Sequence, residues 1–377
     1  MLNAEIHVCL VSAQAAANLL PALDGELRPR KVLLLVSRKM VPRSEALEGV
    51  LKEAGIEAER IEVDDEHDFS RIQEVVLDVA ERYEKDRVAL NVTGGTKLMA
   101  LAAHSVATTA EWEVFYVDLD TDEAITLGEE QRRKRLNSKL RLPHYLRAYG
   151  YSVPGEFRSS WSDSCVVELA QTLVVQTGSL QRAVARLNAI AKRAEDNNRL
   201  REGLEPGQLD EYGFEALLRH FETAGVLVLK GNDVEFASEA HRALAKGGWL
   251  EQHVFRVVTS LADDLGIRDK AMNLCVTDRD GVKNELDVAF IARNRLFVIE
   301  CKTGRLEGLR AEKANDALFK LAEICRRVGG LGTRAMLVSY RALEDAEVRL
   351  ARALGVELVH GSELIRLDEK LKRWVTS

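Results

Sequence analysis

The chain has 377 residues, of which 46% are hydrophobic and 30% are charged, and its formal net charge is −7. This length predicts two or three domains with sizeable cores. The negative charge argues against a protein that coats nucleic acid constitutively, but it does not exclude a local basic groove. No apolar run approaches the length of a membrane-spanning helix, so we expect no contact with a membrane.

Five cysteines are scattered along the sequence without any CxxC pair: Cys9, Cys165, Cys275, Cys301 and Cys325. This pattern predicts a reducing, cytoplasmic environment and argues against structural zinc. The apolar N-terminus contains Glu5 and lacks a basic leader. We therefore expect it to form a strand, a loop and a helix, and not to act as a signal peptide.

The first 128 residues alternate between strand-like and helix-like patterns. Strand-like segments lie at residues 6–12, 31–37, 58–63, 87–92 and 113–118, and helical patterns fall between them, for example at 44–55 and 69–85. Apolar strands that alternate with helices predict a parallel sheet covered on both faces. The fold class that we expect is α/β, with a Rossmann-like, doubly wound domain over residues 1–150.

A charged stretch follows at residues 129–155 and contains the basic run Gln131–Arg141, which has no acidic residue. Two interpretations of this run stay open: a solvated segment between domains, or a contact with nucleic acid.

Residues 151–245 predict a mainly helical connecting region. Helical patterns at 165–176 and 180–195 precede a helix, a short hairpin and a further helix within residues 214–248, and Gly231 marks the hairpin turn. This order resembles a winged-helix module. Such modules often bind DNA, but many are scaffolds, and these helices are not unusually basic, so a scaffold is favoured.

Residues 246–377 predict an αβ domain with a mixed sheet. An amphipathic helix begins near Trp249, and a hairpin follows with strands at 288–292 and 296–300 joined by the turn Ala292–Arg295. Further strands at 333–340 and 355–361 alternate with helices at 314–330 and 343–355.

The loop Thr93–Lys97 leaves the fourth strand of the N-terminal domain and enters a helix. Its glycines allow backbone amides to approach a ligand, and a helix N-terminus attracts anions. The loop is neither a Walker A motif nor a dinucleotide-binding fingerprint. It therefore predicts a phosphate-binding loop. The alternative is a tight turn in which Thr96 is only the N-cap of the helix.

The pattern NVTGGTKLM after the fourth strand, VSAQAAANLLPAL after the first and Ser37 after the second resemble the CARF sensor family. The resemblance implies a homodimer that binds a cyclic oligoadenylate ring across its two-fold axis, a symmetry that suits an even-numbered ring. Ligands of such sheets lie outside the carboxyl ends of the strands. The predicted activator-binding residues are Ser12, Gln14, Asn18, Ser37, Thr93, Gly94, Gly95, Thr96 and Lys97. We expect His104 to be buried or at an interface and not catalytic.

The predicted hairpin brings Asp287 close to Glu300 and Lys302, and residues two apart on a strand share a face. Two carboxylates beside a lysine predict a Mg²⁺ or Mn²⁺ site with a group that activates water. The alternative is a pair of solvated strand ends in which Lys302 forms a surface ion pair.

Asp287 and Glu300-x-Lys302 resemble the PD-(D/E)xK nuclease superfamily, although Leu286 stands where that pattern usually has proline. The preceding helix resembles the one that supplies a further acidic residue, here Glu251. The resemblance implies that Glu251, Asp287 and Glu300, with the backbone carbonyl of Cys301, hold the metal ion. Lys302 would orient or deprotonate the attacking water. We expect Glu285 to be structural or to support the metal ligands without contacting the ion itself.

The two resemblances together match the CRISPR type III ancillary nucleases that cyclic tetra-adenylate activates. They imply a homodimer that nicks or degrades DNA, and that also cuts single-stranded RNA in some members, with little sequence preference. One alternative is a ligand-responsive winged-helix transcriptional regulator whose nuclease-like domain is not catalytic. A second is a restriction or repair nuclease whose N-terminal domain binds another nucleotide.

Overall fold

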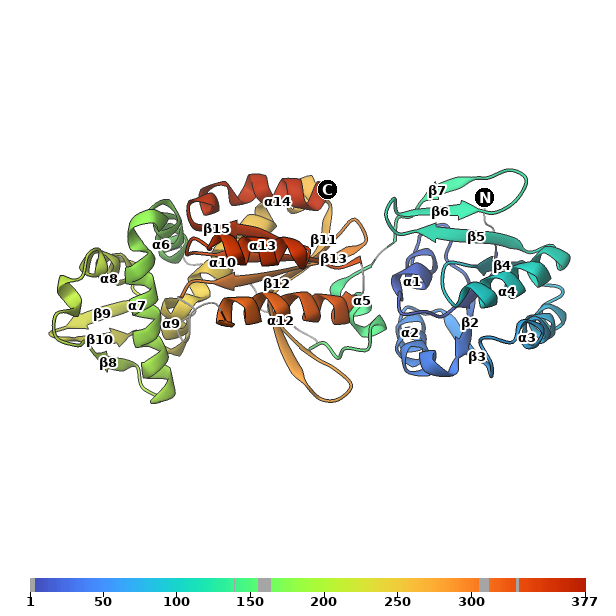
Figure 1. Ribbon diagram of the computed structural model, residues 1–377, viewed down its shortest axis with the longest axis horizontal. Helices are drawn as coiled ribbons and strands as arrows, with labels where there is room; N and C mark the ends of the chain where they lie inside the picture. Colours follow the sequence, from blue (N-terminus) through green and yellow to red (C-terminus); the bar gives the residue numbers. More distant parts are fainter. Residues whose placement is uncertain (1–3, 139, 155–163, 305–311, 330–331) are drawn as a thin grey trace.

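A computed structural model describes residues 4–138, 140–154, 164–304, 312–329 and 332–377, which form three sheets arranged along one axis (Figure 1). The large N-terminal sheet lies at one end and the small sheet of the middle region at the other. The C-terminal sheet lies between them. The C-terminal domain is therefore positioned to contact both of the parts that precede it in the sequence.

The N-terminal sheet has the strand order β3-β2-β1-β4-β5-β6-β7. Its first five strands are parallel, as predicted, whereas the last two pair antiparallel. The strands are β1 (Ile6–Leu10), β2 (Lys31–Ser37), β3 (Glu57–Val63), β4 (Val88–Asn91), β5 (Glu113–Asp118), β6 (Glu123–Thr126) and β7 (Arg133–Arg135). The sheet is thus mixed, which corrects the prediction of a purely parallel one.

Helices cover both faces of this sheet. Apolar residues of α1 and α2 pack into one core cluster, and those of α3 and α4 pack into another, because neighbouring strand residues point to opposite faces. The helices are α1 (Ala16–Ala22), η1 (Arg38–Met40), α2 (Val41–Glu53), α3 (Phe69–Arg82) and α4 (Lys97–Thr109). The predicted doubly wound arrangement is confirmed.

The basic run contributes strand β7, which the sequence pattern did not predict. Arg132 and Arg133 form ion pairs with Glu113 and Glu123 at 3.4 and 3.5 Å. Lys134 lies 3.4 Å from the buried Asp24. These cations therefore neutralise acidic residues of the same domain, which favours the structural interpretation of the run over a contact with nucleic acid.

Among its described residues, the middle region contains four α-helices, one 3-10 helix and a three-stranded antiparallel sheet of order β8-β10-β9. The predicted hairpin turn at Gly231 is present, with a φ of +64°. The winged-helix interpretation stays a prediction. The elements are α6 (Ser164–Val175), α7 (Thr177–Asp196), β8 (Arg201–Gly203), η2 (Gln208–Asp210), α8 (Phe214–Thr223), β9 (Leu227–Lys230), β10 (Asp233–Phe236) and α9 (Glu239–Ala243).

The C-terminal sheet has the order β11-β12-β13-β14-β15, antiparallel across its first three strands and parallel across the rest. The predicted mixed sheet is thereby confirmed. Its strands are β11 (Ile267–Thr277), β12 (Lys283–Ala292), β13 (Arg295–Lys302), β14 (Arg334–Ser339) and β15 (Val356–His360). The helical segments are η3 (Leu244–Gly248), α10 (Trp249–Ser260), α11 (Ala262–Leu265), α12 (Glu312–Gly329), α13 (Asp345–Ala353), η5 (Gly361–Arg366) and α14 (Leu367–Thr376).

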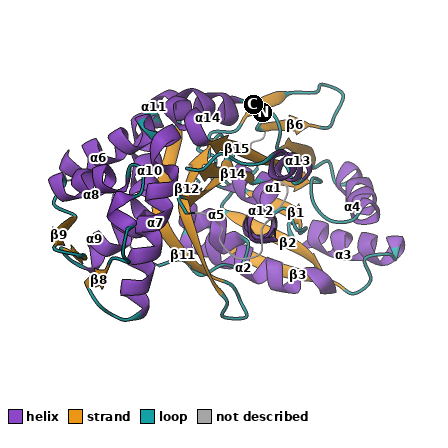
Figure 2. Ribbon diagram, turned by 60° about the vertical axis from the view of Figure 1, so that its left-hand side comes forward, coloured by secondary structure: helices purple, strands orange, loops and turns teal. Residues whose placement is uncertain are grey.

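Helix α5 (Leu142–Ala148) joins the N-terminal and C-terminal domains and lies between α2 and α12 (Figures 1 and 2). The Tyr145 hydroxyl donates a hydrogen bond to the carbonyl of Gly329 at 3.1 Å, and the rings of Tyr145 and Tyr149 stack with their centroids 5.1 Å apart. The Leu142 amide donates to Asp269 at 3.0 Å. One apolar cluster runs through this joint, so the two domains share part of a core.

None of the described helices combines the length and the apolar content that a bilayer crossing requires.

Candidate functional site

A two-residue turn fixes the hairpin on which the predicted catalytic residues lie. Arg293 and Asn294 have φ angles of +48° and +56°, which is the conformation of a type I′ turn. Pairs run from Ala292 opposite Arg295 to Val288 opposite Ile299. The next pair in this register is Asp287 with Glu300, so the predicted hairpin is confirmed and its register brings both carboxylates together.

The Asp287 side chain, in place of a backbone carbonyl of β12, accepts a hydrogen bond from the end of β13. Its Oδ2 accepts a hydrogen bond from the Cys301 backbone N–H at 2.7 Å. The Lys302 ammonium forms an ion pair with the Glu300 carboxylate. The three predicted residues of the hairpin therefore lie within one cluster, in which Asp287 is anchored by the backbone.

Helix α10 supplies Glu251 from its first turn. Trp249 and Leu250, which begin this helix, are fully buried and fix where Glu251 stands. Glu251 lies close enough to Glu300 and Lys302 for their charges to alter its pKa. The structure thus gathers all four predicted residues, whereas Glu285 is exposed on β12 at the margin of the cluster.

The raised pKa values of the carboxyl groups in this cluster are those expected of a site that binds a cation. Burial raises the pKa of Asp287 to about 8, and the carboxylates of Glu300 and Glu251 add to this increase. Burial also raises the pKa of Glu251. Burial alone would lower the pKa of Lys302, but Glu300 and Asp287 outweigh it and the net shift is upward. A divalent cation would relieve the repulsion that raises the pKa values of the carboxyls.

The donor set consists of carboxylate oxygens and a backbone carbonyl, which suits Mg²⁺ or Mn²⁺. Within the described ranges, no three acidic, histidine or cysteine side chains are already arranged as a metal cage. Glu300 instead faces Lys302. The assignment of Glu251, Asp287 and Glu300 as metal ligands therefore stays a prediction that the chemistry of the donors supports.

Asn273 of β11 is a further residue of this cluster that the sequence pattern did not indicate. It lies between the pairs Met272–Val288 and Leu274–Leu286, directly across from Asp287, and its φ is +52°. Its side chain hydrogen-bonds Glu251, while its Oδ1 is buried and has no hydrogen-bond partner among the described residues. The only signal in the sequence is a polar residue inside the otherwise apolar segment 271–276.

In β11 and β12, the alternation of side chains between the two faces of the sheet is interrupted at this point. Ala271 and Leu274 of β11 pack into the same core cluster, and so do Leu286 and Ala289 of β12. Strict alternation would place the members of each pair on opposite faces. The change occurs at Asn273 and Asp287, so the local distortion of the sheet coincides with the acidic cluster.

The carboxyl ends of β1, β2 and β4 meet at one edge of the N-terminal sheet, as predicted. Gly94 passes so close to β1 that a Cβ would lie 2.0 Å from the Leu10 carbonyl oxygen, and Gly95 has a φ of +72°. Thr96 caps α4 by accepting a hydrogen bond from the Met99 N–H at 3.1 Å, which confirms the alternative role given to it. Lys97 is exposed and has no ion-pair partner within the part of the chain that the structure describes.

Three of the predicted activator-binding side chains hold the protein edge together. Asn18 is buried and donates from Nδ2 to the Leu10 carbonyl at 2.9 Å. Thr93 Oγ1 donates to Asn91 at 2.6 Å and accepts from the Val117 N–H at 2.7 Å. Ser37 is also buried. Their contact with a ligand stays a prediction, because the hydrogen bonds of Asn18 and Thr93 are internal and Ser37 is buried.

Ser12 and Gln14 are partly exposed beside this edge. Ser12 Oγ accepts a hydrogen bond from the Gln14 N–H at 3.2 Å. The Tyr149 hydroxyl donates to Gln14 Oε1 at 3.3 Å. Gln14 therefore connects the predicted ligand edge to the residue that stacks on Tyr145 in the joint between the domains.

Comparison with known families identifies the two domains that carry these residues. Residues 6–145 match the family model described as the Card1 CARF domain, and residues 238–377 match the one described as the Card1-like endonuclease domain. The chain therefore joins a Card1-type CARF domain to a Card1-like endonuclease domain. All nine predicted activator-binding residues lie in the CARF match, and all four predicted catalytic residues lie in the endonuclease match.

Solved structures show the same fold. Protein VC1899 from Vibrio cholerae is 27% identical, with 98% of both chains covered and a TM-score of 0.89. Can2 from Sulfobacillus thermosulfidooxidans, solved in complex with cyclic tetra-adenylate, is 24% identical, with 99% of both chains covered and a TM-score of 0.84. A type III CRISPR defence DNA nuclease activated by cyclic oligoadenylate is 19% identical, with a TM-score of 0.62. That match covers 99% of this chain and 52% of the other. No curated protein matches the sequence.

Proposed function

We propose that this chain is a metal-dependent nuclease of type III CRISPR defence that cyclic tetra-adenylate activates. The observation that carries the proposal is the clustering of Glu251, Asp287, Glu300 and Lys302 inside an endonuclease domain that is joined to a CARF domain. The fold shared with Can2, whose structure holds cyclic tetra-adenylate, supports this choice of ring.

Glu251, Asp287 and Glu300, with the Cys301 carbonyl, would hold Mg²⁺ or Mn²⁺. When bound, such an ion lowers the pKa of a coordinated water and polarises a phosphate. Burial lowers the pKa of Lys302, but Glu300 and Asp287 raise it by more, so the net shift is upward. Lys302 is therefore protonated and contributes a positive charge. A protonated lysine orients water and stabilises negative charge on the phosphate, so Lys302 is better suited to these roles than to removing a proton.

The activator would lie at the carboxyl edge of the CARF sheet. The N-terminus of α4 and the exposed Lys97 offer a site for phosphate, while Ser12 and Gln14 offer hydroxyl and amide groups to the adenosines. We propose that two copies share the ring as a homodimer. The exposed side chains of Leu98 and Leu101 on α4 are an apolar surface that a second copy would cover.

DNA is the substrate that we propose first, either as nicked duplex or as single strand, with single-stranded RNA as a second. The relation to a DNA nuclease of the same defence system supports this order. A non-catalytic regulator is disfavoured, because the endonuclease domain retains all four residues in one cluster.

The test is cleavage of supercoiled plasmid and of labelled single strands of DNA and RNA, with Mn²⁺ and cyclic tetra-adenylate present. The wild-type chain should cut, Asp287→Asn should not, and both should bind the ring. Asp280→Asn is the matched control, because Asp280 is an exposed residue of the turn between β11 and β12. Cleavage by Asp287→Asn at the wild-type rate would overturn the assignment of the site.

A further inference from the structure

Thr303 directly follows the Glu300-x-Lys302 motif and is almost completely buried, at 7% exposure. Gly247, just before the helix that carries Glu251, approaches it closely. Gly247 has a φ of +144°, and a Cβ on it would lie 2.4 Å from Thr303 Oγ1. The backbone that leads into α10 therefore packs directly against the residue that follows β13, and only glycine fits between them.

Asn188 of helix α7, in the middle region, completes this contact. It is 9% exposed and lies 2.8 Å from Thr303 Oγ1. With the amide oriented to suit its neighbours, its oxygen accepts from the Thr303 hydroxyl and from the Gly304 N–H at 3.2 Å. Its nitrogen then donates to the carbonyls of Ala245 at 3.0 Å and Val184 at 3.1 Å. One side chain thereby links three elements: α7, the turn before α10 and the end of β13.

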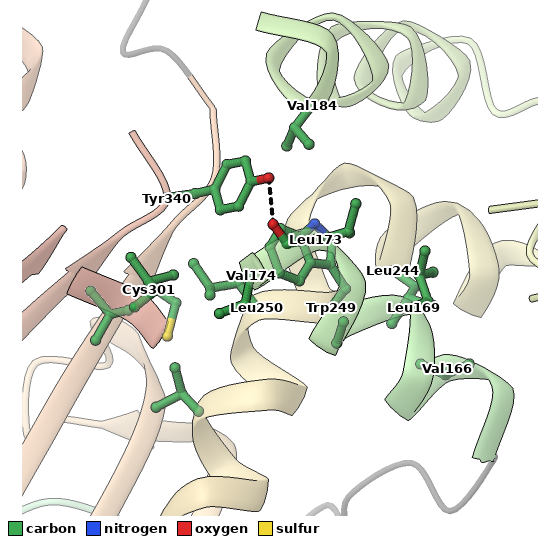
Figure 3. Packing of buried hydrophobic residues seen from close by; sticks show 14 of the residues in the cluster. Val166, Leu169, Leu173, Val174, Val184, Leu244, Trp249, Leu250, Cys301 and Tyr340 are labelled. Atoms are coloured by element: carbon green, nitrogen blue, oxygen red, sulfur yellow. Dashed lines mark hydrogen bonds between the residues drawn. The ribbon is translucent and has the colours of Figure 1, made fainter. Parts of the chain in front are cut away.

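Apolar residues pack around the same connection. Trp249 at the start of α10 stands edge-on to the Tyr340 ring, with centroids 5.1 Å apart (Figure 3). The Tyr340 hydroxyl donates to the carbonyl of Leu173 in α6 at 2.8 Å, and its backbone N–H donates to the Lys302 carbonyl at 2.8 Å. Side chains of α6 and α7, including Val184, surround this pair (Figure 3). The middle region thus covers the place where α10 meets β13.

We infer that Asn188 is a positioning residue for the endonuclease site, acting through Thr303 to hold Glu251 on α10 in place relative to Glu300 and Lys302 on β13. The inference rests on the proposed function and deepens it. It gives the middle region a role in assembling the site, in line with the scaffold interpretation of that region. Residues Leu244–Gly248 form a single π-helical turn, and such turns are frequent at functional sites.

The test compares full-length variants with the wild type. Thr303→Val removes the hydroxyl at nearly constant volume, Asn188→Ala removes its partner, and Thr303→Ser retains the hydroxyl as the conservative rescue. We expect kcat to fall by about tenfold or more in the first two variants, because residues behind metal ligands have effects of that size. KM for DNA should not change. Thr303→Ser should stay close to the wild type.

A second measurement does not depend on activity. Isothermal titration of each metal-free variant with Ca²⁺ should show affinity lowered by about tenfold in Thr303→Val and Asn188→Ala, because Glu251 is no longer held for the ion. Thr223→Val is the matched control: Thr223 is a threonine of α8, in the same middle region, and its hydroxyl donates to the Arg219 carbonyl within its own helix. It should leave both readouts unchanged.

Wild-type kcat and Ca²⁺ affinity in Thr303→Val and Asn188→Ala would overturn the positioning role alone. So would equal losses in Thr223→Val, because they would indicate general destabilisation. A wild-type chain that neither binds Ca²⁺ nor cuts any substrate would instead overturn the proposed function, and with it the inference.

Discussion

Asn273 of β11 lies directly opposite Asp287 of β12, and its side chain hydrogen-bonds Glu251. Its backbone is in the left-handed conformation. Asparagine tolerates this conformation better than most residues, but not without cost. Asn273 thereby connects two of the predicted metal ligands, Glu251 and Asp287, to strand β11. The strain at Asn273 therefore coincides with a connection that the cluster uses.

Asn273→Gly should separate stability from activity. Glycine relieves the backbone strain while the hydrogen bond to Glu251 is lost, so the unfolding free energy should change by less than about 1 kcal/mol. Cleavage should fall by about tenfold, because Glu251 loses a partner that orients it. Urea unfolding and cleavage rates measure the two effects. Asn198→Gly is the control, since Asn198 has a φ of +50° outside the site. Unchanged cleavage in Asn273→Gly would show that Asn273 is only structural.

Stability of the metal-free protein should fall as pH rises from about 4 to about 8. The pKa of Asp287 is raised to about 8 by burial and by Glu300 and Glu251, whereas an unfolded aspartate titrates near about 3.9. Between these values the folded state binds more protons than the unfolded state, so raising the pH favours unfolding. Thermal unfolding in a chelator across this range should show the loss. Asp287→Asn should reduce the slope, and an identical slope in that variant would contradict the shift.

Lys302→Met should have opposite effects on chemistry and on metal binding. Cleavage should fall by about a hundredfold or more, because a charge that stabilises the phosphate is lost. Ca²⁺ affinity should rise, because Glu300 loses the ion-pair partner that competes for its carboxylate. Titration calorimetry measures the second effect, and Lys320→Met on the exposed part of α12 is the control. Weaker Ca²⁺ binding in Lys302→Met would contradict the competition.

Lys97→Ala should raise the concentration of cyclic tetra-adenylate needed for half-maximal cleavage by about tenfold, the effect of losing one charge-assisted contact. The Mn²⁺ requirement should not change, because Lys97 lies in the other domain. Lys85→Ala is the control: Lys85 precedes β4, at the opposite edge of the sheet. An activation curve that coincides with the wild type would remove Lys97 from the ligand site.

The parts of the site that depend on short-range patterns were predictable. Two alternating segments around a two-residue turn determine the register that brings Asp287 beside Glu300. The five parallel strands of the CARF domain follow from their continuous apolar residues. The strand β7 was missed because its residues are all basic, and its pairing depends on acidic partners elsewhere in the domain.

Residues that act through long-range contacts gave no such signal. Asn188 and Thr303 are 115 positions apart, and each is unremarkable in its own segment. Asn273 becomes significant only through the register of β11 against β12. For Asn18 and Thr93 the resemblance implies contact with the activator, and the structure adds internal hydrogen bonds that the sequence did not indicate. Such roles follow from the assembled fold and not from spacing along the chain.

The most direct measurement is cleavage of supercoiled plasmid by the full-length chain in Mn²⁺, with and without cyclic tetra-adenylate. The account predicts cutting only when the ring is present, and none by Asp287→Asn under either condition. Equal cutting without the ring, or ring binding with no cutting of DNA or RNA in any metal, would contradict a nuclease that the CARF domain controls.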